Sequence, residues 1–210
     1  VSEMATNGAK MTNAFVAHPV CGPSRAGIFT GRSPASFGTY SNDDAILGIP
    51  QDIKLLPSLF QENGYATASI GKWHNAKVIR KPKINESKQT RDYHDNMIST
   101  PEAGYAPHER GFDYDFSYYA SGVALWNSPA FWRNGVNVPA PGYTTHLLTD
   151  ETLKFIDEHK DKPFFINLSY SVPHIPLEQA SPAKYMEKFD TGNVEADKYF
   201  AALNAADEGI

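Results

Sequence analysis

Residues 55–74 read LLPSLFQENGYATASIGKWH and predict a helix, a strand and a polar loop, in that order. Leu55, Leu56, Leu59 and Phe60 are spaced as on one face of a helix, and the following Asn-Gly is a typical helix end. The short run 66–70 has the length and composition of a buried strand. It leads directly into Gly71-Lys72-Trp73-His74, so this strand ends at a loop with reactive side chains.

The same order of elements recurs elsewhere in the chain. Residues 11–16 read as a strand leading into His18-Pro19-Val20-Cys21. Further on, apolar positions between Leu148 and Ile156 predict a helix with Asp150 and Glu151 near its start. Residues 164–170 follow as a strand that ends at Pro173-His174-Ile175-Pro176. Helices that alternate with apolar strands predict an α/β fold with a largely parallel or mixed central sheet flanked by helices.

All three polar motifs follow the carboxyl ends of expected strands. In open α/β sheets, ligands bind at that edge. We therefore expect Cys21, Lys72, His74 and His174 to lie near one another.

Residues 75–146 show no regular pattern. They contain a charged stretch, Lys77 to Asp92, and an aromatic one, Phe112 to Trp132. Long irregular loops over an α/β sheet often shape a substrate site, and a solvated insertion with aromatic packing is the equal alternative. The whole chain of 210 residues has the length of a single domain.

Composition excludes several classes of protein. Hydrophobic content of 41% and charged content of 20% are ordinary for a soluble globular chain. A net charge of −5 and a pI near 5.8, without runs of Lys or Arg, argue against nucleic-acid binding. No apolar stretch approaches membrane-spanning length.

Cys21 is the only cysteine, so an internal disulfide and a cysteine metal cluster are excluded. An inert buried thiol, a reactive nucleophile and a modified residue remain. Pro23 suits the first turn of a helix and Gly31 its end, which puts Cys21 at a helix entrance where backbone N–H groups favour an oxyanion. Arg25 adds a positive charge about one turn away.

Three further side chains are candidates for the same chemistry. Lys72 and His74 are two residues apart, and on an extended segment they would face one anionic group together. His174 lies between Pro173 and Pro176, and its imidazole could give a proton to a departing alkoxide. The other histidines are expected to be structural or at the surface, with His18 close enough to Cys21 to line the pocket: His18, His94, His108, His146 and His159.

These motifs together resemble the type I sulfatases of the alkaline phosphatase superfamily. The resemblance rests on Cys21-Gly22-Pro23-Ser24-Arg25 with Thr30-Gly31-Arg32, on residues 71–74 (GKWH) and on residues 164–174 (FFINLSYSVPH), and it extends from about Gly8 to Ile210. One departure follows the second motif, where Asn75-Ala76 stands in place of the usual Leu-Gly. Residues 1–210 would then be part of a sulfatase catalytic domain.

The resemblance implies a mechanism for sulfate ester hydrolysis. A formylglycine-generating enzyme would oxidise Cys21 to formylglycine, whose hydrate attacks sulfur. His174 would protonate the leaving alcohol, and His74 would remove the proton that expels sulfate. Lys72 and Arg25 would hold the charge, and Ca²⁺ would polarise nucleophile and substrate. A sulfated carbohydrate or aryl sulfate is the implied substrate, and a periplasmic or secreted location is the tendency of glycan-degrading members.

The resemblance also predicts that this chain is a fragment. Ca²⁺ needs about six oxygen ligands. The implied Asp pair before Gly8 and the Asp-Asn pair after Ile210 are not in the sequence, which leaves Cys21, as formylglycine, as the only candidate metal ligand. We expect the 210 residues alone to be inactive. Two alternatives remain: a phosphonate or phosphate diester hydrolase of the same superfamily, and a non-catalytic module that binds sulfated glycans.

Overall fold

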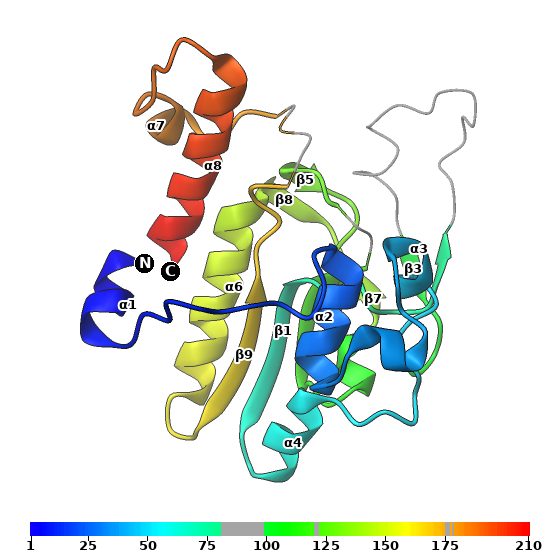
Figure 1. Ribbon diagram of the computed structural model, residues 1–210. Helices are drawn as coiled ribbons and strands as arrows, with labels where there is room; N and C mark the ends of the chain where they lie inside the picture. Colours follow the sequence, from blue (N-terminus) through cyan, green and yellow to red (C-terminus); the bar gives the residue numbers. More distant parts are fainter. Residues whose placement is uncertain (81–98, 120–121, 175–176, 178) are drawn as a thin grey trace, which may run out of the picture.

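The computed structural model describes residues 1–80, 99–119, 122–174, 177 and 179–210 as a mixed sheet flanked by helices (Figure 1). The five-stranded sheet has the order β7-β6-β4-β1-β9. Its members are β1 (Ala66–Lys72), β4 (Tyr114–Tyr118), β6 (Trp132–Arg133), β7 (Val136–Asn137) and β9 (Phe164–Ser169). β1 pairs in parallel with β4 and β9, while β6 and β7 run antiparallel to their neighbours. The predicted α/β fold with a mixed sheet is confirmed.

The remaining elements are helices and two small two-stranded sheets. Two-stranded sheets pair β2 (Val78–Arg80) with β3 (Ser99–Pro101) and β5 (Trp126–Ser128) with β8 (Ala140–Tyr143). The helices are α1 (Ser2–Asn7), α2 (Cys21–Thr30), α3 (Asn42–Ala45), α4 (Leu56–Glu62), α6 (Thr144–His159), α7 (Ala183–Met186) and α8 (Val194–Gly209), with 3₁₀ turns η1 (Pro34–Phe37) and η2 (Pro107–Glu109).

Helices cover both faces of the sheet. On one face, Ala66, Ala68 and Ile70 of β1 pack against Leu148 and Phe155 of α6. On the other face, residues of α2, α4 and their loops form a second core, which includes Phe29, Leu55, Trp73, Phe112 and Phe165. Figure 1 shows α6 on one side of β1 and β9 and α2 and α4 on the other. Every residue of β1 is buried, as expected for a parallel strand covered on both faces.

The predicted strand at residues 11–16 is wrong. The segment forms no strand, and its apolar side chains are exposed: Met11 by 73%, Phe15 by 94% and Val16 by 66%. A strand needs a neighbour that pairs with its backbone and covers its apolar face. In the structure this segment runs over the surface towards α2, and its apolar residues have no neighbouring strand (Figure 1).

The predicted helix around Leu148 exists but begins earlier than its acidic residues indicated. α6 starts at Thr144, so Asp150 and Glu151 lie in its second turn. Thr144 anchors this start, because its backbone N–H donates to Leu125 O at 2.8 Å and its hydroxyl donates to Ala124 O at 2.8 Å. The polar residues of the first turn concealed the helix start in the sequence.

The expected irregular region, 75–146, contains regular structure. β4 lies within it and is a full member of the central sheet, next to β1. Its buried Asp115 and Ser117 broke the apolar pattern that marks a core strand. Most of the predicted charged stretch, residues 81–92, lies outside the described residues.

Candidate functional site

Cys21 is the first residue of α2, as predicted. The helix ends at Thr30, and Gly31 follows in the left-handed conformation at φ 63°. Val20, at the N-cap, provides no side-chain acceptor. That acceptor comes instead from Asn42 of α3, whose Oδ1 accepts from the Gly22 N–H at 3.0 Å and from the Cys21 thiol at 3.3 Å. Asn42 is a site residue that the sequence analysis missed.

Gly22 allows α2 and α3 to approach closely. A Cβ on Gly22 would lie 2.4 Å from Ala45 Cβ, 3.1 Å from Asn42 Oδ1 and 3.7 Å from His74 Cε1. The first distance is far below van der Waals contact, so a side chain at this position would force the helices apart. The third shows that the imidazole of His74 lies against the first turn of α2.

Lys72 ends β1 and is buried, with 4% of its surface exposed. Burial lowers the pKa of its ammonium group to about 8, and the nearby Arg25 guanidinium acts in the same direction. A hydrogen bond and the charge of Cys21 partly offset this lowering. The ammonium therefore lies beside Cys21, as the sequence analysis expected.

Arg25 joins the ends of two strands. Its Nη1 donates to the backbone oxygen of Lys72 at 2.8 Å and to Ser169 Oγ at 2.8 Å. Lys72 ends β1 and Ser169 ends β9, so one guanidinium fixes both carboxyl ends against α2. Burial lowers the pKa of Arg25 as well. Ser169 is the second residue that the sequence analysis missed, because nothing in its spacing indicates the contact.

His74 has a backbone conformation that the sequence did not indicate. β1 ends at Lys72, and His74 has φ 57°, in the left-handed region that residues with side chains seldom adopt. The extended geometry expected for Lys72 and His74 is therefore wrong, although both side chains are buried next to the first turn of α2. Such backbone conformations persist where surrounding structure holds them, often at functional sites.

His174 is exposed and lies five residues beyond Ser169, directly after a turn that follows β9. Its backbone N–H donates to Ser171 O at 2.9 Å. Ile175 and Pro176, which complete the predicted turn, lie outside the described residues. The approach of the His174 ring to Cys21 stays a prediction.

We call Cys21, Arg25, Asn42, Lys72 and His74 the cysteine cluster. The buried ammonium of Lys72, the partly buried guanidinium of Arg25 and the N-terminus of a helix meet here at the carboxyl ends of parallel strands. Each of these features stabilises an anion. The cluster is therefore suited to a tetrahedral oxyanion with a reactive centre at Cys21.

The implied Ca²⁺ does not fit the residues described. No group of three or more His, Cys, Asp or Glu side chains in the described ranges could hold a metal ion. Asn42 Oδ1 is turned to two donors, the Cys21 thiol and the Gly22 N–H. This donor set falls short of the six or more oxygen ligands that Ca²⁺ takes.

The other histidines that can be described make local contacts. His18 Nδ1 accepts from Val20 N–H at 3.1 Å, His146 contacts the Tyr185 hydroxyl at 2.8 Å, and His159 contacts Phe155 O at 2.8 Å. These bonds are consistent with structural roles. His94 lies outside the described residues.

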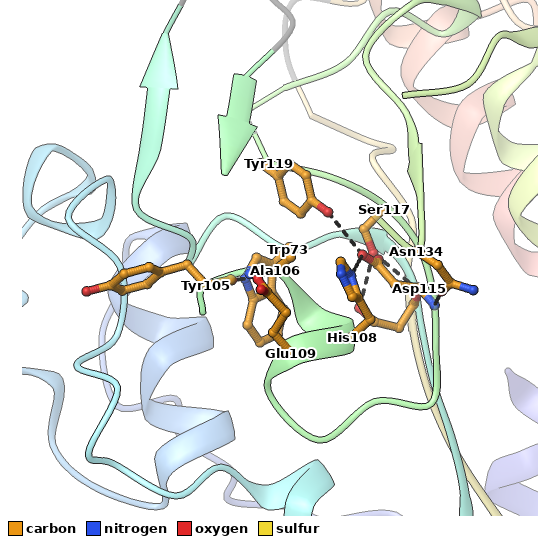
Figure 2. Close-up of polar contacts among 10 residues, drawn as sticks. Trp73, Tyr105, Ala106, His108, Glu109, Asp115, Ser117, Tyr119 and Asn134 are labelled. Atoms are coloured by element: carbon orange, nitrogen blue, oxygen red, sulfur yellow. Dashed lines mark hydrogen bonds and ion pairs between the residues drawn. The ribbon is translucent and has the colours of Figure 1, made fainter. Parts of the chain in front are cut away.

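His108 belongs to a second polar cluster, shown in Figure 2. Its Nδ1 lies 3.3 Å from Oδ2 of the buried Asp115, which also accepts from the Tyr119 hydroxyl at 3.0 Å. The backbone N–H of Asp115 donates to Asn134 Oδ1 at 2.8 Å. Burial raises the pKa of Asp115, and hydrogen bonds from His108, Ser117 and Tyr119 oppose that rise. We call these five residues the Asp115 cluster.

No helix in the described ranges is long and apolar enough to cross a membrane.

Comparison with known proteins gives one consistent result. The sulfatase family profile matches residues 1–210. An uncharacterized sulfatase of Escherichia coli (strain K12), YdeN, is 47% identical over 205 residues, which cover 97% of this chain and 36% of that protein. An N-acetylglucosamine-6-O-sulfatase of Bacteroides thetaiotaomicron is 30% identical over 175 residues, covering 83% of this chain and 26% of that protein.

A solved structure with its substrate D-glucosamine-2-N,6-O-disulfate bound superposes with a TM-score of 0.60 at 27% identity, covering 85% of this chain and 29% of that one. The chain spans about a third of the length of the curated relatives that it matches. The family profile matches the whole chain, and a relative at 47% identity matches nearly all of it. The chain belongs to the sulfatase family.

Proposed function

We propose that the protein to which these residues belong hydrolyses sulfate esters through a formylglycine made from Cys21, and that its substrate is a sulfated carbohydrate or an aryl sulfate. The cysteine cluster carries this proposal: the thiol of Cys21 lies at a helix N-terminus beside a buried ammonium and near a partly buried guanidinium. Membership of the sulfatase family supports the reaction. The names of one relative and of one bound substrate support a sulfated sugar.

Formylglycine would supply the nucleophile, because one hydroxyl of its hydrate forms the bond to sulfur while the bond from sulfur to the alcohol oxygen breaks. The remaining steps belong to side chains of this chain. His174 gives the proton that the departing alkoxide takes up. His74 takes the proton of the second hydroxyl as sulfate leaves and the aldehyde returns. Water then restores the hydrate.

Lys72 and Arg25 stabilise the negative charge during both steps. The burial of Lys72 and the partial burial of Arg25 increase the strength of these interactions, since water screens them less. Because Arg25 also bonds to Lys72 O and Ser169 Oγ, it holds the strand ends in place when substrate arrives. No step is assigned to Ca²⁺. Conversion of Cys21 requires a modifying enzyme that supplies the oxidant, and we expect a periplasmic or secreted location.

The mass of the peptide that contains Cys21 tests the covalent role. In the full-length protein from its native host, conversion of the thiol to the aldehyde lowers this mass by about 18 Da. An unmodified thiol in a preparation that hydrolyses sulfate esters would refute the formylglycine mechanism.

Assays on matched aryl sulfate and aryl phosphate esters test the reaction class. We expect turnover of the sulfate ester to exceed that of the phosphate ester. The reverse order would favour a phosphate or phosphonate ester hydrolase, and binding without turnover by a protein with unmodified Cys21 would favour a glycan-binding module.

A further inference from the structure

We propose that Asn42 is a positioning residue, whose amide oxygen fixes the first turn of α2 and the direction of the Cys21 side chain. The proposal rests on the proposed function in one respect, since its kinetic test assumes turnover at Cys21. It concerns a residue outside all of the sequence motifs.

The identity of the contacting atom follows from its partners. The backbone N–H of Gly22 can only donate, so the atom of Asn42 that lies 3.0 Å away is the carbonyl oxygen. The same oxygen lies 3.3 Å from Cys21 Sγ, and therefore takes the thiol hydrogen. One acceptor thus binds a helix N–H and the reactive side chain together. An N–H in the first turn of a helix has no partner within the helix, and Val20 offers none.

Asn42 is itself held in place by its own helix. The Ser41 hydroxyl donates to Asp44 Oδ2 at 2.9 Å and accepts from the Asp44 N–H at 3.3 Å. Tyr40 N–H also donates to Asp44 Oδ2, at 3.0 Å. These bonds fix the start of α3, on which Asn42 is the first residue. The backbone of Asn42 therefore has a defined position independent of α2, and the side-chain amide reaches α2 from there.

Close packing around Gly22 and the polar partners of Cys21 limit where the Cys21 side chain can point. Ala45 Cβ lies so close to Gly22 that no Cβ fits there, and the ring of His74 is at ordinary contact distance from the same position. The Lys72 ammonium also hydrogen-bonds with the Cys21 side chain. Asn42 as acceptor and Lys72 as donor together restrict the direction of the Cys21 side chain. A hydroxyl group at the position of Sγ would find the same acceptor.

Two variants of the full-length protein test this role. Asn42→Leu removes the acceptor at similar volume. Asn193→Leu is the matched control, because Asn193 caps α8 by accepting from Glu195 N–H and Ala196 N–H and lies outside the cysteine cluster. Both variants lose a bond to a helix N-terminus, so a loss of helix capping alone affects them alike.

The kinetic measurement is turnover of an aryl sulfate per molecule of converted protein, with conversion counted by peptide mass. For Asn42→Leu we expect kcat to fall by roughly 10- to 100-fold with little change in KM, since a misplaced nucleophile slows the reaction more than binding. Asn42→Asp keeps the acceptor and should recover part of kcat. An Asn42→Leu variant with the kcat of the Asn193→Leu variant would overturn the proposal.

A second measurement is independent of sulfatase activity. In protein expressed without the modifying enzyme, Cys21 is the only thiol within these residues and can be alkylated with iodoacetamide. We expect Asn42→Leu to alter the alkylation rate by about threefold or more, because the thiol loses its acceptor. Equal rates in the wild type, Asn42→Leu and Asn193→Leu would refute the positioning role. If the wild type shows no turnover, the proposed function fails while this measurement still decides the role of Asn42.

Discussion

The cysteine cluster includes the end of β1, the Asp115 cluster is built on the neighbouring strand β4, and the two clusters balance their charges differently. The cysteine cluster holds two cationic side chains, the buried Lys72 and the partly buried Arg25, and none of its five members is a carboxylate. The Asp115 cluster buries one carboxylate and surrounds it with donors from His108, Ser117 and Tyr119.

This difference separates a structural cluster from a site that needs a ligand. Buried charge is unfavourable unless it is paired. Oδ2 of Asp115 has its partners within the protein (Figure 2), whereas Oδ1 is buried without a hydrogen-bond partner among the described residues. The cationic pair of the cysteine cluster gains most from an anion that arrives from outside, and this expectation can be tested at both clusters.

The largest expected effect is at the nucleophile. Cys21→Ala in the full-length protein should lower turnover of a sulfate ester on the order of 10⁴-fold, as removal of a catalytic nucleophile does elsewhere. Alanine loses the bonds of the thiol to Asn42 and Lys72 and keeps the backbone of α2, so circular dichroism and the melting temperature should change little. Activity retained by this variant would remove Cys21 from the mechanism.

At Asp115 we expect a loss of stability without a loss of kcat. Asp115→Leu leaves the Tyr119 hydroxyl and the His108 ring without their acceptor in the core, which should lower the free energy of unfolding by about 3 kcal/mol. Urea denaturation measures this loss, with Asp161→Leu at an exposed position as the control. The kcat per folded molecule should stay unchanged. A loss of kcat without a loss of stability would assign the Asp115 cluster to catalysis instead.

Lys72 should make anion binding depend on pH. Because burial lowers its pKa to about 8, the amine is neutral above that pH when no anion is present. Stabilisation by sulfate is measured as the rise in melting temperature over chloride at equal ionic strength. This rise should be larger near pH 7 than near pH 9.5, because the site loses about one positive charge between the two pH values.

The control for this measurement is Lys72→Met, which should show a small rise that is equal at both pH values. A wild type that shows the same rise at both pH values would mean that Lys72 does not contact the anion. The comparison with chloride separates anion binding from general effects of salt.

Local patterns in the sequence predicted the elements around the site well. The helix stop at Asn63-Gly64, the strand of residues 66–70 and the helix that starts at Cys21 are all in the structure. Each depends on neighbouring residues: a turn dipeptide, a short apolar run, a proline in a first helical turn. The family of the chain also followed from contiguous motifs.

Features that depend on distant contacts could not be predicted in this way. Asn42 touches Cys21 from 21 residues away, and Ser169 touches Arg25 from 144 residues away. β4 was missed because Asp115 is polar, and its acceptability in the core depends on His108 and Tyr119. Residues 11–16 show the reverse error, since their apolar pattern has no neighbouring strand to pack against.

The smallest expected effect is the pH dependence of the Asp115 cluster. The hydrogen bond to Asp115 raises the pKa of His108 above its ordinary value. Protonated His108 therefore stabilises the fold fully below about pH 6.5, and this contribution disappears as the pH rises through the folded-state pKa. Burial raises the pKa of Asp115, so the contribution of this carboxyl group to the free energy of unfolding also decreases as the pH rises.

Between about pH 6 and pH 8, the wild type should lose about 1 kcal/mol of unfolding free energy relative to His108→Gln. The expected loss is this small because solvent weakens the partly exposed pair of His108 and Asp115. Parallel urea titrations of both proteins at the two pH values measure this difference, and a difference of the opposite sign would show that His108 is neutral throughout and that Asp115 is held by Tyr119 and Ser117 instead.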